Sequence, residues 1–242
     1  MGPTSATAPE TAAVETLSGD HPYVESGTLN GSALLVAHHR ALVGSESYTV
    51  TDRTTGTDVD SGSVAVEDHL VLRVNRSQER SNGSWLVAQS RRAPDQPSDT
   101  YRNATAHCTH QSGTVECDER PFTTATYRQF GRDVLFLGTV RKLNRSTFEP
   151  DGTVIRDGQA LYRYTATGLR SDRPAGGDGE YVTDAELVSA TVLVTGAGYV
   201  YEFTETVAGD RDGDSGRLRV ERTHRVTGMN GTTVEVPGWV GA

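Results

Sequence analysis

Two stretches in the second half of the chain decide the fold, Ala160–Thr167 (ALYRYTAT) and Tyr199–Val207 (YVYEFTETV). In both, aromatic side chains recur at every second position, which is the period of a β-strand with one buried face. This spacing places five rings on one side of two strands: Tyr162, Tyr164, Tyr199, Tyr201 and Phe203. We expect them to line a common concave or buried surface, either as solid core beneath a helix or as the wall of a partly open apolar cavity.

Strand patterns separated by turn signals continue on both sides of these stretches. In the second half they predict an antiparallel meander that also includes Phe148–Ile155, Leu187–Thr195, Leu218–Val226 and Thr232–Val236. In the first half they predict strands at Ser47–Asp52, Leu70–Val74, Trp85–Gln89, Thr100–Thr109 and Thr114–Cys117. The chain is therefore predicted to be rich in antiparallel β-structure.

Two segments have the helical period instead. A short amphipathic helix is predicted around Leu34–Leu42, with Asn30 or Ser32 as its N-cap. A longer apolar stripe predicts a central helix from about Thr123 to Leu143. The first 24 residues are rich in Thr, Ala, Pro and Glu and lack periodicity, which is typical of a flexible tether. We predict a tether at residues 1–24 and a single β-rich domain at residues 25–242.

The two cysteines are spaced for a hairpin disulfide. Ser112-Gly113 suits a two-residue turn, and counting outward from it puts Cys108 opposite Cys117 at a non-hydrogen-bonded pair. The Cα atoms at such a pair are close enough for a disulfide, which an oxidising exterior would preserve. A metal site is the alternative, because Cys108, His110 and Cys117 share one face of this hairpin.

Every asparagine of the chain begins an N-glycosylation sequon: Asn30, Asn75, Asn82, Asn103, Asn144 and Asn230. Because glycosylation acts outside the cytoplasm on accessible backbone, this pattern predicts an exported cell-surface glycoprotein. Three of the sequons contain Asn-Gly, and at Asn82-Gly83 and Asn230-Gly231 a hairpin turn would also favour this pair without any glycan.

The composition is acidic, with a formal net charge of −9 and Lys142 as the only lysine. Such a surface stays hydrated in molar salt, where repulsion between carboxylates is screened, so a halophilic archaeal source is predicted. A mildly acidic secreted mesophilic protein is the alternative. No basic stripe interleaved with aromatic residues is present, which argues against a nucleic-acid partner.

No motif in the sequence predicts an enzyme, a metal or a cofactor. Asp210, Asp212, Asp214 and Glu221 match some positions of a calcium loop, but Ser215 stands where the sharp turn needs glycine. The glycines at 176–179 lack the Lys-Ser/Thr of a phosphate-binding loop. His38, His39, His69 and His224 have no acid or cysteine at ligand spacing, so structural or surface roles are favoured for them.

The element order and several short motifs resemble a family of secreted haloarchaeal lipoproteins of unknown function. The resemblance rests on the Thr/Pro-rich tether, His38–Leu42 (HHRAL), Ser47–Val50 (SYTV), Leu161–Tyr164 (LYRY) and Gly198–Val200 (GYV), and covers residues 25 to 240. The order of elements is also similar to bacterial lipoprotein carriers of the LolA and LppX type.

That similarity implies an α+β fold in which a strongly curved antiparallel sheet, a half-barrel, carries an N-terminal helix and a central helix on its concave face. It implies, by analogy, a lipid or other hydrophobic ligand contacted by the five rings. The start, Met1–Thr4, has neither a charged nor an apolar signal region, so an export signal and lipid anchor are expected upstream. An envelope scaffold or adhesion module with a packed core is the alternative function, and a hydrolase is a more distant one.

Overall fold

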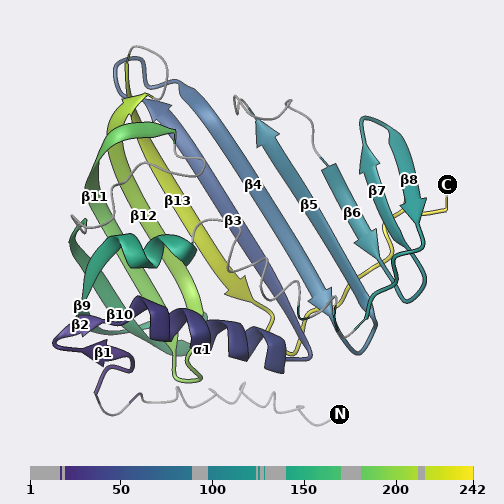
Figure 1. The fold of residues 1–242 in the computed structure, drawn as a ribbon, viewed down its shortest axis with the longest axis horizontal. Helices are drawn as coiled ribbons and strands as arrows, with labels where there is room; N and C mark the ends of the chain where they lie inside the picture. The colour runs from purple at the N-terminus through teal and green to yellow at the C-terminus, as the bar shows by residue number, and fades with distance from the viewer. Residues whose placement is uncertain are drawn as a thin grey trace, which may run out of the picture.

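The computed structural model describes residues 17, 20–88, 98–123, 125, 128, 140–169, 181–211 and 216–241. Within them, eleven strands form one open, curved antiparallel sheet (Figure 1). The first six strands are β3 (Ser47–Asp58), β4 (Val64–Asn75), β5 (Arg80–Ala88), β6 (Ser98–Arg102), β7 (His107–Gln111) and β8 (Thr114–Asp118). The other five are β9 (Ser146–Arg156), β10 (Gln159–Leu169), β11 (Val182–Thr195), β12 (Val200–Arg211) and β13 (Arg217–Thr227).

The strand order shows that the sheet consists of two meanders joined side by side. It runs β8-β7-β6-β5-β4-β3-β13-β12-β11-β10-β9, so each half of the chain pairs with itself except at the β3/β13 seam. There Leu218 pairs with Asp58 and Thr227 with Thr49. The seam therefore brings residues from the start of the first meander against the end of the second.

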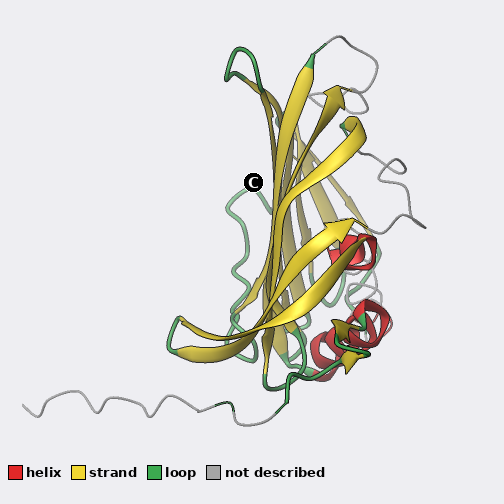
Figure 2. Ribbon diagram, turned by 90° about the vertical axis from the view of Figure 1, so that its left-hand side faces the viewer, coloured by secondary structure: helices red, strands yellow, loops and turns green. Residues whose placement is uncertain are grey.

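One face of the sheet is covered by the N-terminal part of the chain. Helix α1 spans Gly31–Gly44, and the Oδ1 atom of its N-cap Asn30 accepts a hydrogen bond from the backbone N–H of Ala33. A small hairpin, β1 (Val24–Glu25) and β2 (Thr28–Leu29), precedes it, and the 3₁₀-helix η1 (Val140–Arg145) lies on the same side of the sheet (Figure 2). The predicted central helix lies largely outside the described residues.

Part of the predicted tether packs against this fold. Leu17 and Tyr23 contact a buried apolar cluster, and the Tyr164 hydroxyl donates a hydrogen bond to the backbone oxygen of Pro22. Residues 1–16 lie outside the described part of the chain.

The buried apolar side chains fall into three clusters. The central cluster contains Leu42, Tyr48, Val50, Leu72, Val74, Phe122, Leu161, Leu193, Tyr199, Tyr201 and Val226. The ring cluster contains Leu34, Leu143, Phe148, Tyr162, Tyr164, Ala190, Val192, Val194, Val200 and Phe203. The distal cluster contains Ala65, Val66, Val182, Val207, Leu218 and Val220. Leu34 and Leu42 of α1 join the ring and central clusters respectively, which fixes the helix to the sheet.

The hairpin disulfide is confirmed. Cys108 pairs with Cys117 across β7 and β8, their Cα atoms are 4.0 Å apart, and the two residues are disulfide-bonded. Ser112 and Gly113 both have positive φ angles, as a type I′ turn requires. The alternative metal site is excluded because both sulfur ligands are used in this bond.

Two strand predictions are wrong. Thr100–Thr109 is divided between β6 and β7, because the Asn103 side chain accepts hydrogen bonds from the backbone N–H groups of Thr105 and Ala106 and forms a turn. Thr232–Val236 is not a strand, although it alternates like one. Its backbone N–H groups bind side chains of the first meander instead, from Thr232 to Ser47 Oγ and from Val234 to Gln78 Oε1.

Candidate functional site

The strands at the β3/β13 seam carry charged side chains at positions that alternation assigns to the buried face. On β13, the buried residues are Leu218, Val220, Arg222, His224 and Val226. On β12, Glu205 lies between the buried Phe203 and Val207. Since buried charges are costly unless they are paired, each of these residues needs a specific partner from a neighbouring strand.

The strand register arranges these residues in two rows that cross the sheet. In the first row, Tyr164, Val192, Phe203, His224, Asp52 and Leu70 are successive cross-strand neighbours from β10 to β4. In the second row, Ala190, Glu205, Arg222, Thr54 and Asp68 are neighbours from β11 to β4. We call Asp52, Asp68, Glu205, Arg222 and His224, together with His38 of α1, the buried polar site.

Glu205 and Arg222 form an ion pair inside the fold. Arg222 Nη1 lies 2.9 Å from Glu205 Oε2, and both side chains are 2% exposed. The low local dielectric strengthens the attraction, while the loss of hydration opposes it, so the net contribution of such a pair to stability is small. Loss of one partner, by contrast, leaves a charge buried without compensation.

His224 is paired with a carboxylate of the neighbouring strand. Its Nδ1 atom lies 2.9 Å from Asp52 Oδ1, and its side chain is fully buried. His38 approaches the same ring from α1, with ring centroids 5.7 Å apart and an interplanar angle of 73°. The helix and the seam of the sheet therefore meet at two histidines.

His38 is held by the backbone of β12. Its Nδ1 atom accepts a hydrogen bond of 3.2 Å from the N–H group of Val200. Burial, followed by the nearby His224 and His39, lowers the pKa of His38 well below its ordinary value of 6.5. The ring is therefore neutral near pH 7.

Asp68 is the last residue of the second row and lies on β4. Its Oδ2 atom accepts a hydrogen bond from the hydroxyl of Tyr181. Burial raises the pKa of Asp68, while the hydrogen bond from Tyr181 acts in the opposite direction.

Several polar atoms of this site have no hydrogen-bond partner among the residues that the structure describes. They are His38 Nε2, His224 Nε2, Asp52 Oδ2, Asp68 Oδ1 and Arg222 Nη2. Leaving a buried donor or acceptor unsatisfied costs about 1–3 kcal/mol, so folded proteins rarely keep a group of them without a water or a ligand to bind. A polar group of a ligand placed here would remove this cost.

The five rings predicted from the sequence are all buried, but they do not form one stripe. Tyr162, Tyr164 and Phe203 belong to the ring cluster, and Tyr199 and Tyr201 to the central cluster. The pairing of β11 with β12 shifts register between Leu193 and Val194, and this irregularity interrupts the simple alternation of β12.

The environments of the rings differ accordingly. Phe203 packs edge-on against Phe148, whereas the Tyr201 hydroxyl reaches outward to Asp157 and accepts a hydrogen bond of 2.8 Å from Arg225 Nη2. Burial raises the pKa of Tyr164 above its ordinary range.

Sequence reasoning missed the partners of the histidines. His224 was expected to have no neighbouring acid, yet Asp52 lies beside it although it is 172 positions away in the chain. A signal was present, because Asp52, Glu205, Arg222 and His224 all interrupt the apolar alternation of strands that were predicted individually. The pairing of those strands across the seam was not predicted.

The sequon asparagines have structural roles in the fold. Besides capping α1, Asn30 donates a hydrogen bond of 2.8 Å from Nδ2 to Glu25 Oε2. Asn75 is buried, and its Nδ2 atom donates to the backbone oxygen of Thr232. Asn230 is exposed, and its Oδ1 atom accepts from the backbone N–H of Glu46. Asn82 lies in β5 with its Oδ1 atom buried.

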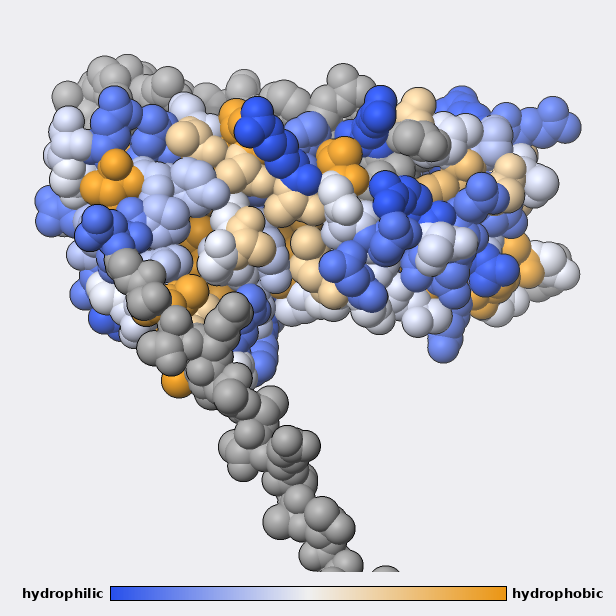
Figure 3. Space-filling view, turned by 90° about the horizontal axis from the view of Figure 1, so that it is seen from below, coloured by the Kyte–Doolittle hydropathy of each residue, from blue (hydrophilic) through white to orange (hydrophobic). Residues whose placement is uncertain are grey.

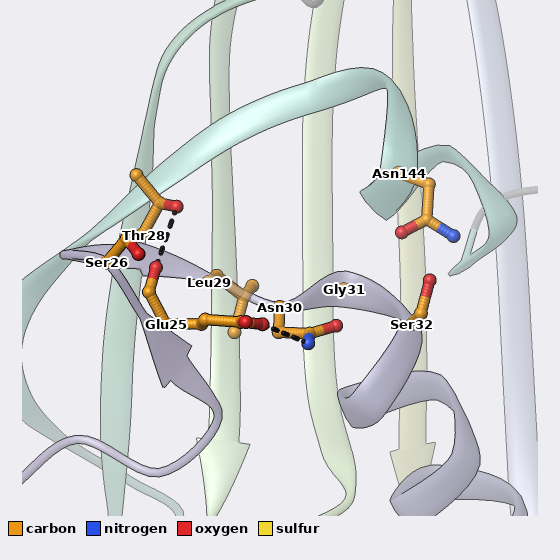
Figure 4. A pocket seen from close by; sticks show the side chains of 8 residues that line it. All are labelled: Glu25, Ser26, Thr28, Leu29, Asn30, Gly31, Ser32 and Asn144. Atoms are coloured by element: carbon orange, nitrogen blue, oxygen red, sulfur yellow. Dashed lines mark hydrogen bonds between the residues drawn. The ribbon is translucent and has the colours of Figure 1, made fainter.

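Asn30 and Asn144 face one surface pocket of about 420 Å³ between α1, the β1–β2 hairpin and η1 (Figure 4). Gly31 makes this approach possible, because a Cβ atom there would lie 2.6 Å from Asn144 Oδ1. The pocket is lined mainly by short polar side chains, so it does not suit an apolar ligand.

A second, larger pocket of about 770 Å³ runs along the outer side of α1. Tyr23, Val36, Ala37, Arg40 and Ala197 are among its lining residues, and hydrophobic side chains lie among hydrophilic ones on this side of the molecule (Figure 3). It opens to solvent on the side of the helix away from the buried polar site.

The described part of the chain contains no group of three or more His, Cys, Asp or Glu side chains arranged for a metal ion. Of the residues that match a calcium loop in part, Glu221 lies within β13 opposite Thr206, and Asp212, Asp214 and Ser215 lie outside the described residues. None of the helices among the described residues has the length and apolar character needed to cross a membrane.

No protein-family model matches the chain, and no curated protein matches it either. Among solved structures, it is similar to LprF from Mycobacterium bovis, with 12% identity, a TM-score of 0.39, and coverage of 86% of this chain and 96% of that chain.

It is also similar to a LolA superfamily protein from Nitrosomonas europaea, with 8% identity, a TM-score of 0.24, and coverage of 85% and 94%. A third similar structure is a putative outer membrane lipoprotein-sorting protein domain from Vibrio parahaemolyticus. Its identity is 11% and its TM-score 0.24, with coverage of 85% of this chain and 95% of that chain. TM-scores of this size carry no information about function, which has to come from the strand register and the buried side chains.

Proposed function

We propose that this protein is an exported, non-enzymatic binding protein for a hydrophobic ligand such as a lipid. The observation that carries the proposal is the first row of the sheet, in which Tyr164, Val192 and Phe203 lead directly to His224 and Asp52. An apolar surface thus continues into buried polar atoms without partners. An amphiphile has the same division into an apolar chain and a polar end.

The ligand would lie between the sheet and the elements that cover it. The apolar rings of the ring cluster would contact its chain, with Tyr199 and Tyr201 extending the apolar surface through the central cluster. Such contacts stabilise a complex in proportion to the apolar area buried, at about 25 cal/mol per Å² before the cost of association. Selectivity for chain structure would accordingly be low.

The surroundings of the histidines favour a binding role over catalysis. The Asp52–His224 pair could orient a general base, but His224 Nε2 has no hydroxyl or thiol within hydrogen-bonding distance among the described residues. Among the residues that the structure describes, the pair has no nucleophile of the kind that such a hydrolase needs.

The location of the protein is part of the same proposal. We infer export to the cell surface and N-glycosylation from the sequons, and a lipid anchor upstream of the tether from the resemblance to secreted haloarchaeal lipoproteins. The Cys108–Cys117 disulfide supports an oxidising compartment, and the acidic, lysine-poor composition supports a high-salt habitat.

An envelope scaffold or adhesion module is the second candidate. The five rings are at most 8% exposed, as they would be in a solid core that holds no ligand. In that case the glycans and the outer face of the sheet would make the contacts.

Native mass spectrometry of protein purified from its host without detergent separates the two functions. The binding function predicts a lipid-sized mass adduct that organic extraction removes and that returns on incubation with host lipid. Val36→Asp is the control for the outer pocket, because Val36 is 51% exposed on α1 and lines that pocket. It should leave the adduct unchanged. An empty protein that also takes up no added lipid would contradict the binding function and support the scaffold function. Loss of the adduct in Val36→Asp would show that the ligand binds in the outer pocket.

A further inference from the structure

The tautomer of His38 is fixed by its backbone contact. Since Nδ1 accepts the hydrogen bond from Val200 N–H, the proton of the neutral ring is on Nε2. That Nε2–H group is a donor inside the fold, and the described part of the chain provides no acceptor for it. The ring is fully buried, so bulk water does not satisfy it.

The tautomer of His224 is opposite. The carboxylate of Asp52 can only accept, so the 2.9 Å contact places the ring proton on Nδ1 of His224. In the neutral form of this ring, Nε2 keeps its lone pair and is an acceptor without a donor among the described residues. The two fully buried rings are neighbours, with centroids 5.7 Å apart.

Two neighbouring rings at the end of the apolar row therefore carry a donor and an acceptor without partners among the described residues. We propose that they bind the hydroxyl group of a long-chain alcohol, which accepts a hydrogen bond from His38 Nε2–H and donates one to His224 Nε2. This inference rests on the proposed function, because it assigns the polar end of the ligand bound there. The alkyl chain extends from the histidines along Phe203, Val192 and Tyr164, the successive neighbours of His224 in the first row.

Other polar groups fit this pair less well. A metal ion on His38 Nε2 would force the proton to Nδ1, where it would meet the N–H group of Val200. A carboxylate or phosphate would face the lone pair of His224 Nε2 and the carboxylate of Asp52, which contacts the same ring. An ether oxygen accepts a hydrogen bond from His38 Nε2–H but has no hydrogen to donate to His224 Nε2. A hydroxyl group satisfies both atoms at once.

The experiment compares dodecanol, its methyl ether and dodecane, each delivered from cyclodextrin to protein freed of lipid. Ring ¹⁵N shifts of His38 and His224, measured by NMR during each titration, report both affinity and the hydrogen bonds of the Nε2 atoms. We expect the alcohol to bind roughly tenfold or more tightly than the ether, because the ether leaves a buried acceptor unpaired. The alcohol alone should shift both Nε2 signals in the directions of a new donor and a new acceptor contact.

Substitutions test the same contact. His224→Phe should reduce the preference for alcohol over ether to about one while dodecane still binds, and His69→Phe, on β4 outside the buried polar site, should keep the wild-type preference. If none of the probes binds, the proposed function fails together with the inference. If all three bind equally, the binding function stands and the hydroxyl contact is refuted. Binding of the alcohol without a change at either Nε2 would show that a buried water holds these atoms, which also refutes it.

Discussion

Removing one partner of the Glu205–Arg222 ion pair should destabilise the protein far more than removing one partner of an exposed pair with the same geometry. Arg217 and Glu186 provide that comparison, since their closest atoms are 2.8 Å apart, against 2.9 Å for the buried pair. The side chains of the exposed pair are 46% and 73% exposed, and those of the buried pair are 2% exposed. Burial is thus the main difference between the two.

The magnitudes follow from that difference. Arg222→Met leaves the Glu205 carboxylate buried without a cation, and such a change costs about 3–5 kcal/mol of unfolding free energy. Glu205→Leu should cost a similar amount by leaving the guanidinium unpaired. Arg217→Met should cost less than about 1 kcal/mol, because an exposed pair is screened and hydrated. The double substitution Glu205→Leu with Arg222→Met removes both charges and should cost at least about 3 kcal/mol less than the sum of its single changes.

Urea unfolding at fixed salt concentration measures all four variants, and an unchanged m-value confirms that only stability differs. Two results would refute the reasoning. One is a cost below about 1 kcal/mol for Arg222→Met, which would mean that water reaches the Glu205 carboxylate. The other is additivity in the double variant, which would mean that the two side chains do not interact.

Three further predictions concern other parts of the fold. Burial lowers the pKa of His38 below 6.5, so as the pH falls the unfolded chain binds a proton at this residue before the folded chain does. The free energy of unfolding should therefore be constant in this respect above about pH 6.5 and decrease as the pH falls below it. The free energy of unfolding should change by at most about 1.4 kcal/mol per pH unit because of this group. Urea unfolding at several pH values should show a smaller slope for His38→Gln than for the wild type. An identical slope would contradict the lowered pKa of His38. Reducing the Cys108–Cys117 disulfide should lower stability by about 2–3 kcal/mol, measured with and without reductant, and no change would mean that the β7–β8 hairpin is ordered without it. Glycopeptide mapping of the host protein should find glycan on the exposed Asn230 and none on the buried Asn75, and full occupancy of Asn75 would show that its hydrogen bond to Thr232 is not maintained.

The sequence predicted those features that depend on local chemistry. The two-residue turn fixes the register of a hairpin within a few residues, so the pairing of Cys108 with Cys117 could be counted directly. Alternation and turn residues likewise located most strands of both meanders. Errors occurred where a side chain replaced the strand partner, as at Thr232, or formed a local turn, as at Asn103.

The candidate site could not be predicted in the same way, because it depends on long-range pairing. Each histidine lacked a partner within its own segment, and only the β3/β13 seam brings Asp52 to His224. The contact of His38 also requires α1 to pack across β12. Alternation identified the buried rings, but the irregular pairing of β11 with β12 divided them between two clusters.

The buried polar site also determines how the two meanders meet. A slip of one residue at the seam would turn Arg222 and His224 to the opposite face and bring Glu221 and Arg225 inward, away from their present partners. Side chains of the apolar clusters discriminate less sharply between registers, since one aliphatic contact resembles another. Buried charges are retained in some proteins for this reason, even when apolar residues would be as stable.

This role and ligand binding make different demands on the same residues. Register depends on the pairs Glu205–Arg222 and Asp52–His224, whereas ligand binding depends on the atoms those pairs leave unused. The double substitution Glu205→Leu with Arg222→Met removes one pair and leaves both histidines in place. It should therefore keep the preference for alcohol over ether if the remaining pair still holds the register, and it should lose that preference together with the ordered contact between His38 and His224 if the seam shifts.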